Sequence, residues 1–363
     1  MFVNYQTCNT TTDVVQDSIS SLRSAYESLS IYKNRITCHH LERNWDHYKK
    51  YINKYESIYS PSFHYPSVSA YRPVSRSFFK LCEILQEFNI GMSPTPLCAV
   101  FLAEGPGGFV EAFARHRTKN NVAKSDQYHA ITLPQGLNHN IPNWRLSPAR
   151  KLATEGGADS IHAHEGDICD IHRGLDPFIM SVGKNKAHFI TADGGFDFSQ
   201  NFNCQEERAV KLVASQVYAA IEMQHVGGTF ILKIYDVHTI EMVKLLSVLY
   251  QTYEKIAFIK PHTSRPANSE KYVVCMNFKC IPSLTLRIVV RNALYDHIHI
   301  DPVFAKNLAE INDKLVQKQI KAIDDVLSLI LSSPNEEMLT MLANEGTQSS
   351  RNWCIQYGIP TSQ

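Results

Sequence analysis

The pattern of apolar and polar residues changes at about residue 70, from long helical periods to short apolar runs. Apolar residues recur every three to four positions over 13–32 and over 41–59, which predicts two helices with one apolar face each. Residues 1–12 are polar and predict a loose start. The Pro- and Ser-rich stretch 60–69 indicates a boundary between this helical start and the segment that follows.

The middle of the chain alternates between strand and helix patterns. Apolar runs over 99–103, 128–133, 160–164, 187–193, 227–235, 255–260 and 271–276 predict strands, whereas 75–88, 110–117, 205–224 and 239–250 predict helices. A long irregular stretch lies over 134–148. Alternating strands and helices that end in a hairpin-like pair predict a three-layer α/β sandwich with a mostly parallel sheet.

The C-terminal part returns to helical periodicity, with 302–331 and 336–344 as the predicted helices. We therefore expect a helical N-terminal extension over 1–69, an α/β domain over 70–280 and a helical C-terminal extension over 281–363.

Composition narrows the class of protein. The 363 residues include 36 Lys and Arg against 35 Asp and Glu, so any affinity for nucleic acid must come from a local patch. No apolar run approaches the roughly 20 residues that span a bilayer, and the N-terminus lacks the basic start and apolar core of a secretory signal. Nine cysteines without a paired C-x-x-C array favour reduced thiols and no metal site, hence a cytoplasmic or nuclear protein that is not secreted.

A glycine-rich turn, Gly105-Pro-Gly-Gly108, lies between the first predicted strand of the α/β domain and the helix after it. Glycine lets the backbone bend sharply and removes the Cβ atoms that would keep a ligand away from the main chain. In an open α/β sheet, a turn at the carboxyl end of a strand is the usual place for a nucleotide-like ligand. The alternative is that these glycines serve packing only.

Two lysines and two carboxylates are predicted to converge on one cleft. Lys233 lies inside an apolar strand, where an ammonium needs a partner, and Asp193 at the end of the neighbouring strand is the expected one. Lys80 and Glu270 lie where their elements meet the same sheet edge. A second ammonium lowers the pKa of the first, which gives a lysine able to accept a proton from a hydroxyl. Taken singly, each residue also fits a surface or ion-paired role.

The order of these motifs resembles the K-D-K-E tetrad of the FtsJ-like S-adenosylmethionine-dependent RNA ribose 2′-O-methyltransferases. Over residues 70–280 it comprises Lys80, the glycine turn, Asp193, Lys233 and Glu270. The run Ser-Arg-Pro-Ala-Asn-Ser-Glu before the last strand most resembles the cap-specific branch of eukaryotes and large DNA viruses, which methylates the first transcribed nucleotide of messenger RNA. The resemblance implies a seven-stranded Rossmann-like sheet whose last strand is antiparallel.

The resemblance also implies a cofactor site, with two departures. The family commonly has an acid five positions before the turn proline, where this chain has Phe101, so part of that role passes to Glu104. Thr132-Leu-Pro stands where an acid often grips the cofactor ribose. Asp167 matches the position assigned to the adenine amino group. The implied S-adenosylmethionine-binding residues are Glu104, Gly105, Pro106, Gly107, Gly108, Phe109, Asp167 and Asp193.

The mechanism that the resemblance implies is an in-line displacement without a metal. Lys233 would orient and deprotonate the RNA 2′-hydroxyl, and Asp193 would position the lysine and face the methyl-sulfonium region. Lys80 and Glu270 would tune and brace this pair. Much of the rate would come from holding hydroxyl and methyl in line.

RNA contacts require cations and aromatic rings. Aromatic candidates for a cationic methylated guanine are Tyr65, Tyr71 and Phe78, with core packing as the alternative for each. The cationic candidates are Arg115, Arg117, Lys119, Arg145, Arg150, Lys151 and Arg265, with a solvated surface as the alternative.

Two other functions stay open at this point. One is the same chemistry on ribosomal or transfer RNA, and the other is a non-catalytic RNA-binding scaffold that keeps the fold. The capped 5′ end of messenger RNA is the expected partner, with a protein of the capping machinery as a second one and no membrane. A viral protein of this branch would act in the host cytoplasm or the virion.

Overall fold

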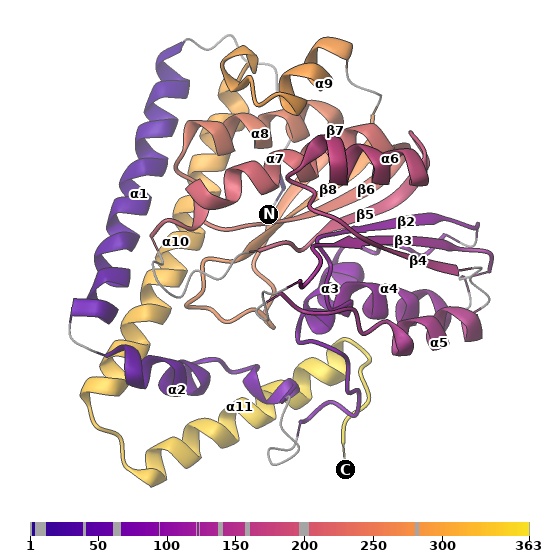
Figure 1. The fold of residues 1–363 in the computed structure, drawn as a ribbon. Coiled ribbons are helices and arrows are strands. Elements are labelled where there is room, and N and C mark those ends of the chain that lie inside the picture. Colours follow the sequence, from indigo (N-terminus) through magenta and orange to yellow (C-terminus); the bar gives the residue numbers. More distant parts are fainter. Residues whose placement is uncertain are drawn as a thin grey trace.

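The computed structural model describes residues 2–3, 12–38, 41–60, 67–93, 95–120, 122, 124–136, 141–156, 160–195, 203–279 and 283–362. One sheet lies between two helical layers, and long helices from both ends of the chain run beside it (Figure 1). The strands are β1 (Phe2–Val3), β2 (Cys98–Leu102), β3 (Gln127–Thr132), β4 (Ser160–Glu165), β5 (Ala187–Ala192), β6 (Gln224–Ile234), β7 (Tyr253–Ile259) and β8 (Lys271–Phe278). The helices are α1 (Thr12–Cys38), α2 (Glu42–Ile52), α3 (Ser77–Glu87), α4 (Gly108–Lys119), α5 (Ser147–Gly156), α6 (Asp176–Val182), α7 (Gln205–Met223), α8 (Ile240–Thr252), α9 (Leu284–Arg291), α10 (Pro302–Leu331) and α11 (Glu336–Gln356).

The sheet has the order β1-β7-β8-β6-β5-β2-β3-β4. Strands β2 to β6 pair in parallel, and β8 pairs antiparallel with β6 and with β7. The predicted seven-stranded sheet with an antiparallel last strand is therefore confirmed. An eighth strand, β1, pairs antiparallel with the edge of β7, so the predicted loose start is wrong at residues 2–3.

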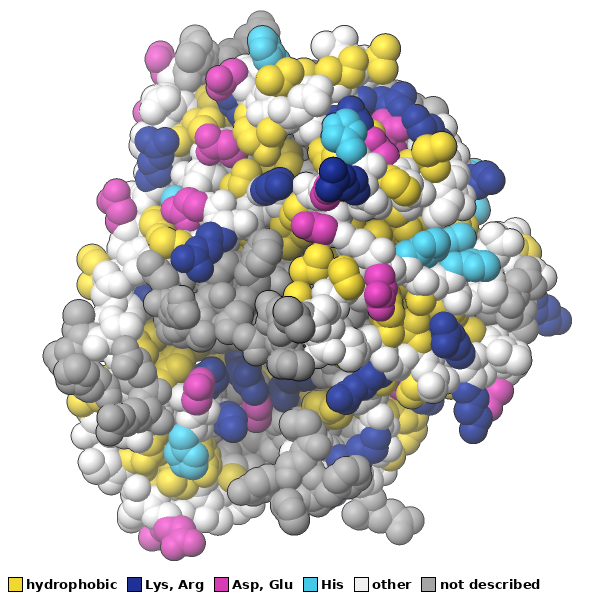
Figure 2. Space-filling view, viewed as in Figure 1, with side chains coloured by type: hydrophobic (Ala, Val, Ile, Leu, Met, Phe, Trp, Pro, Cys, Tyr) yellow, Lys and Arg dark blue, Asp and Glu magenta, His cyan; other side chains and the backbone are white. Residues whose placement is uncertain are grey.

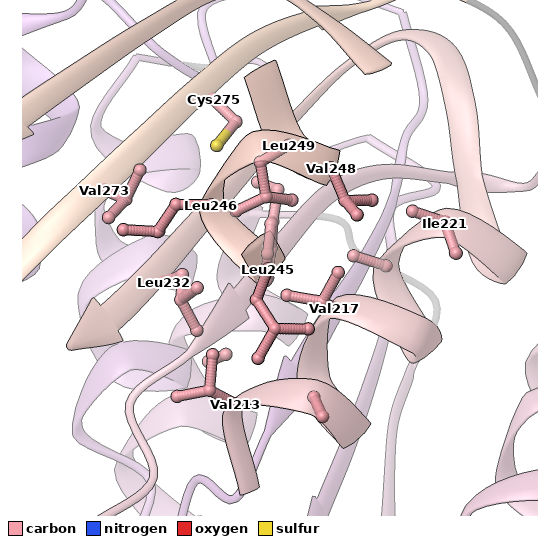
Figure 3. Close-up of a cluster of buried hydrophobic side chains, with 14 of the residues drawn as sticks. Val213, Val217, Ile221, Leu232, Leu245, Leu246, Val248, Leu249, Val273 and Cys275 are labelled. Atoms are coloured by element: carbon pink, nitrogen blue, oxygen red, sulfur yellow. The ribbon is translucent and has the colours of Figure 1, made fainter. Parts of the chain in front are cut away.

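Alternation along the strands supplies both faces of the sheet with apolar side chains. In β2, Val100 and Leu102 belong to the core under α6, α7 and α8, whereas Ala99 and Phe101 belong to the core under α3, α4 and α5. Figure 3 shows the first core, where valines, leucines and an isoleucine of α7 and α8 pack over β6 and β8. A sheet buried on both faces leaves its strand ends as the place for polar chemistry.

The extensions are helical, as predicted, and pack against the central fold. Helix α1 runs alongside α10 (Figure 1), with Leu29 and Ile36 packed in one cluster with Val326. From the C-terminal end, Trp353 of α11 packs edge-on to Phe79 of α3. Helix α2 ends at Ile52, earlier than predicted, α11 runs on to Gln356, and α5 and α6 have no predicted counterpart. The domain bounds 1–69, 70–280 and 281–363 stay a prediction.

No helix in the described part of the chain is both long and apolar enough to cross a membrane.

The predicted RNA contact Arg117 is wrong, because its side chain is 0% exposed. Its Nε and Nη2 donate to the two carboxylate oxygens of Asp126, both at 2.7 Å, and Nη1 donates to the carbonyl oxygen of Gly91 at 2.9 Å. This pair ties the end of α4 to the start of β3, at the amino edge of the sheet. Arg117 lies near the end of an amphipathic helix and is nevertheless buried, because Asp126, nine residues later, neutralises its charge.

Replacing Arg117 by Leu tests this structural role. It leaves Asp126 buried without its counter-charge, so we expect the free energy of unfolding to fall by about 3–5 kcal/mol. Urea unfolding followed by circular dichroism measures this change. Lys151→Ala, at an exposed lysine, is the control and should change the value by less than about 0.5 kcal/mol. Equal urea midpoints for Arg117→Leu and the wild type would contradict the assignment.

Candidate active site

The candidate site lies where the strand order changes direction. Strands β2 and β5 are parallel neighbours, and Leu102 is in register with Ala192. From β2 the chain continues through β3 and β4 on one side, whereas β5 and β6 lie on the other side. The segments that follow both strands, with Glu104 and Asp193, therefore emerge side by side at the carboxyl edge. Open α/β sheets bind their ligands at such a switch point.

Lys233, next to the last residue of β6, pairs with Asp193 as predicted. Its Nζ lies 3.1 Å from Asp193 Oδ1 and donates to the backbone carbonyl oxygen of Asp193 at 2.6 Å. The hydroxyl of Tyr272 donates to the same Oδ1 at 2.8 Å. One carboxylate oxygen therefore fixes a lysine and a tyrosine from two neighbouring strands.

Lys80, on α3, pairs with Glu270, which immediately precedes β8. Its Nζ lies 2.7 Å from Oε1 and 2.8 Å from Oε2 of Glu270, and the hydroxyl of Ser264 donates to Oε1 at 2.8 Å. The side chains of the two ion pairs are 10–15% exposed. Lys80, Asp193, Lys233 and Glu270 thus form two ion pairs, close enough for the charges of Lys233 and Glu270 to act on each other, and the catalytic roles of these residues stay predictions.

The pKa directions follow from burial and from these partners. Burial alone would raise the pKa of Glu270, but the ammonium groups of Lys80, Lys233 and Lys260 more than offset it and lower the pKa to about 2. Burial would lower the pKa of Lys233, yet the charge of Asp193 and its hydrogen bond to the lysine, together with the charges of Tyr235 and Glu270, outweigh burial and raise this pKa. The predicted lowering of the Lys233 pKa by a second ammonium is therefore wrong in this structure. Lys80 is paired with Glu270, and the charge of Glu270 contributes to the raised pKa of Lys233.

Glu104 carries an unsatisfied carboxylate oxygen. Its Oε1 accepts hydrogen bonds from the backbone N–H groups of Phe109 at 2.7 Å and Val110 at 3.3 Å, at the start of α4. Its Oε2 is buried and has no hydrogen-bond partner in the described part of the chain. Burial, reinforced by the nearby charge of Asp193, raises the pKa of Glu104 well above its usual value. Two neighbouring carboxylates with one free oxygen fit a cationic ligand.

The glycines of the turn are required by the protein itself. A Cβ atom on Gly107, whose φ is +114°, would lie 2.6 Å from Leu146, and one on Gly108 would lie 2.1 Å from the hydroxyl oxygen of Ser75. At Gly105 it would lie 2.7 Å from the hydroxyl oxygen of Thr132. Protein atoms therefore fill the space of the missing side chains, which supports the packing alternative. Cofactor binding by the turn backbone stays a prediction.

The two departures from the family pattern have structural explanations. Phe101 is buried on the α4 side of the sheet, with its ring centroid 5.9 Å from that of Phe113, so it cannot hold a cofactor. Thr132 Oγ1 accepts a hydrogen bond from the Gly105 N–H at 3.1 Å, which ties the end of β3 to the turn. Asp167 follows β4, is exposed, and lines a cavity of about 510 Å³ together with Lys211. Its adenine-binding role stays a prediction.

The predicted RNA contacts are dispersed. Arg150 and Lys151 on α5 are exposed, as is Arg145 just before that helix. Lys119 is exposed too and donates to the carbonyl oxygen of Gly358 at 2.9 Å. These four cations are available to a ligand, and their role stays a prediction.

Other predicted contacts already have protein partners. Arg265 donates to both carboxylate oxygens of Glu56, at 2.7 and 3.1 Å. The guanidinium of Arg115 lies over the ring of Tyr71, 4.0 Å from its centroid. Phe78 is fully buried, so its predicted contact with a cap base is wrong. Tyr65 lies outside the described residues.

Sequence reasoning missed Tyr272, Ser264 and Lys260. Lys260 Nζ donates to the carbonyl oxygens of Asn268 and Glu270, each at 2.6 Å, and thereby folds the loop that carries Glu270. Tyr272 is the direct cross-strand partner of Lys233 in the antiparallel pairing of β6 with β8. The pattern could have placed this tyrosine on the lysine's side of the sheet once that pairing was assumed.

Within the described residues, no group of three or more His, Cys, Asp or Glu side chains could hold a metal ion.

Comparisons with known proteins supply the family of this chain. The family model described as FtsJ-like methyltransferase matches residues 73–278. The cap-specific mRNA (nucleoside-2′-O-)-methyltransferase 1 of Danio rerio is 32% identical over 185 residues, covering 48% of this chain and 21% of that protein. The same protein of Homo sapiens is 38% identical over 128 residues, covering 34% and 15%. The cap-specific mRNA (nucleoside-2′-O-)-methyltransferase 2 of Drosophila melanogaster is 27% identical over 246 residues, covering 64% and 34%.

These alignments span only 15–34% of the length of the three relatives. The family match, in contrast, takes in more than half of this chain and contains the strands β2 to β8 and both ion pairs. The chain therefore belongs to the FtsJ-like methyltransferase family.

Proposed function

We propose that this chain transfers a methyl group from S-adenosylmethionine to the ribose 2′-hydroxyl of the first transcribed nucleotide of capped messenger RNA. The observation that carries the proposal is the Lys233–Asp193 ion pair beside the Lys80–Glu270 ion pair at the switch point of the sheet. The names of the relatives supply the substrate, since each is called cap-specific. The same names disfavour ribosomal or transfer RNA, and the complete tetrad disfavours a non-catalytic scaffold.

The cofactor's positive charge suits the acidic side of the site. S-adenosylmethionine would supply a methyl group activated by its sulfonium, and its cationic groups match the free oxygen of Glu104 and the carboxylate of Asp193. Asp167, at the end of β4, would contact the adenine from the rim of the 510 Å³ cavity. Positive charge next to Glu104 also lowers the cost of keeping that carboxylate ionised while buried.

The protonation state of Lys233 controls the chemistry that it can perform. The raised pKa, to which Asp193 contributes most, keeps Lys233 an ammonium, which can orient a hydroxyl oxygen but cannot take its proton. A positive charge beside Asp193 offsets the negative charge that Asp193 presents to Lys233. The pKa of Lys233 then falls back toward its usual range. The neutral fraction of Lys233, which grows as its pKa falls, can then accept the 2′-hydroxyl proton as the oxygen attacks, which is general base catalysis.

The other residues keep this arrangement balanced. Glu270 neutralises Lys80, so the second lysine adds no net positive charge to the cleft. The Tyr272 hydroxyl fixes the orientation of the Asp193 carboxylate and moderates its charge toward Lys233. A partner protein of the capping machinery and a nuclear or cytoplasmic site of action complete the proposal.

Lys233→Ala tests the chemical assignment. Loss of the general base should lower the methyl-transfer rate by about 10²–10⁴-fold, while the Kd for RNA stays within about twofold. Transfer of a radiolabelled methyl group to capped RNA and fluorescence anisotropy measure the two quantities. Lys255→Ala, at an exposed lysine on β7, is the control and should leave both unchanged. Full transfer by Lys233→Ala would show that the tetrad assignment is wrong.

A cap-dependence assay tests the substrate. Two RNAs of identical sequence, one with a methylated guanine cap and one with a 5′ triphosphate, are compared for methyl incorporation by the wild type. We expect at least about tenfold faster transfer to the capped RNA, because a bidentate or stacked contact that is lost costs about 1.4 kcal/mol or more. Equal rates would reject cap specificity and leave the methyl-transfer chemistry standing.

Tyr272→Phe tests the electrostatic control of Lys233. Without the hydroxyl donor, Asp193 acts more strongly on Lys233 and raises its pKa further, so less neutral lysine is present at a given pH. The rising limb of the kcat–pH profile should move by about one unit to higher pH, and kcat near neutral pH should fall about tenfold with KM unchanged.

The control for this variant is Tyr253→Phe, which removes the hydroxyl of another fully buried tyrosine, hydrogen-bonded to Gln224 at 2.9 Å. It should not displace the pH profile. A uniform loss of kcat at every pH in Tyr272→Phe would instead indicate a purely structural role.

A further inference from the structure

A second cavity, of about 980 Å³, lies beside the active site. Three segments form it: residues 52–55 at the end of α2 and just after it, residues 258–271 from the end of β7 to the first residue of β8, and the face of α10 over 311–325. Helix α2 crosses the lower part of α10 on this side of the molecule (Figure 1). The first and third segments lie outside the family match at 73–278, so the extensions of this chain build the cavity against the family fold.

The cavity is strongly cationic. Six lysines and two aspartates line it. In the described part of the chain, no acid lies within ion-pair distance of Lys54, Lys314 or Lys318, in contrast to the paired lysines of the active site. Figure 2 shows Lys and Arg side chains, with some Asp and Glu side chains among them, in a hollow below the centre of this face. Lysines that share a concave surface and have no counter-charge attract an anion.

The same cavity has an apolar wall. Phe258, Ile311 and Leu315 line it, and at its edge the ring of Tyr55 packs against that of His262 with centroids 5.2 Å apart. Its volume is that of a small-molecule or cofactor site. A cationic rim over an apolar and aromatic wall suits a ligand that carries both phosphates and a flat base, which is a nucleotide.

The cavity shares residues with the loop that carries Glu270. Lys260 and Ser264 line it, and both donate hydrogen bonds to Glu270, to its backbone carbonyl oxygen and to its carboxylate respectively. From α10, Gln319 donates to the carbonyl oxygen of Ala267 at 3.2 Å and to the hydroxyl of Ser269 at 3.1 Å. An occupant of the cavity therefore adjoins the residues that position the tetrad, which favours a nucleotide of the bound RNA over an unconnected ligand.

We propose that this cavity binds a nucleotide of the RNA substrate other than the methylated one, with its phosphates held by Lys54, Lys314 and Lys318. The inference rests on the proposed function only for the identity of the substrate as RNA. It adds a binding surface that the shared fold does not contain.

The test is the affinity of the full chain for a short fluorescein-labelled capped RNA, measured by anisotropy between 50 and 200 mM salt. The variant is Lys314→Gln with Lys318→Gln, and the control is Lys255→Gln with Lys306→Gln, which removes the same charge at two exposed lysines outside the cavity. Loss of two phosphate contacts should weaken binding about tenfold at low salt and reduce the slope of log K against log salt by about 1.4. Equal affinity and slope in variant and control would overturn the proposal.

A competition experiment distinguishes the two possible occupants of the cavity, a nucleotide of the RNA and a free nucleotide. GTP and inorganic triphosphate are titrated against the labelled RNA. If either alone displaces the RNA from the wild type at micromolar concentration, and the lysine variant loses only that competition, a free nucleotide occupies the cavity and the proposal is overturned. Weak competition by both, together with weakened RNA binding by the variant, supports it.

Methyl transfer by the same proteins keeps the two hypotheses distinct. If the wild type transfers methyl groups and the lysine variant binds RNA normally, this inference is wrong and the proposed function stands. If the wild type transfers no methyl groups but its RNA binding still depends on Lys314 and Lys318, the proposed function is wrong and the assignment of the cavity stands.

Discussion

The structure depends on one carboxylate oxygen, Oδ1 of Asp193. It receives the ammonium of Lys233 and the hydroxyl of Tyr272, at a place where an isolated ammonium would be too costly to bury. The pairing of β5 with β6 and of β6 with β8 brings the three residues together, so the fold and the site are specified by the same register. Removing this carboxylate would therefore disturb both the stability of the sheet and the chemistry at its edge.

Charge balance explains why two lysines can occupy so small a space. Lys80 and Glu270 form an ion pair, and Ser264 and Lys260 donate hydrogen bonds to Glu270. Asp193 makes the largest of the contributions that raise the pKa of Lys233, ahead of Tyr235 and Glu270. A positive charge beside the carboxylate of Asp193 would therefore change the pKa of Lys233 without any movement of Lys80.

The pairing of Lys233 with Asp193 was predictable because each residue stands out within its own stretch of sequence. A lysine within an apolar strand demands an acid, and Asp193 follows the neighbouring strand, so their pairing could be inferred from the sequence. Arg117 could not be placed correctly, since its surroundings resemble an exposed helix end and its burial depends on Asp126 and on the carbonyl oxygen of Gly91. Tyr272 looks like an ordinary core aromatic, and only the cross-strand register places it opposite Lys233, where its hydroxyl reaches Asp193. The cationic cavity depends on how α10 packs, which periodicity does not encode.

The two hydrogen bonds from Gln319 to the loop before Glu270 have an evolutionary consequence. A helix outside the shared fold supports a loop inside it, so substitutions in the two segments cannot be selected independently. A change at Ser269 that suits a relative with a different C-terminal helix would be harmful here unless position 319 changed with it. Lineages of this family that acquire or replace such helices should therefore show paired variation at these positions, even where the tetrad itself is invariant.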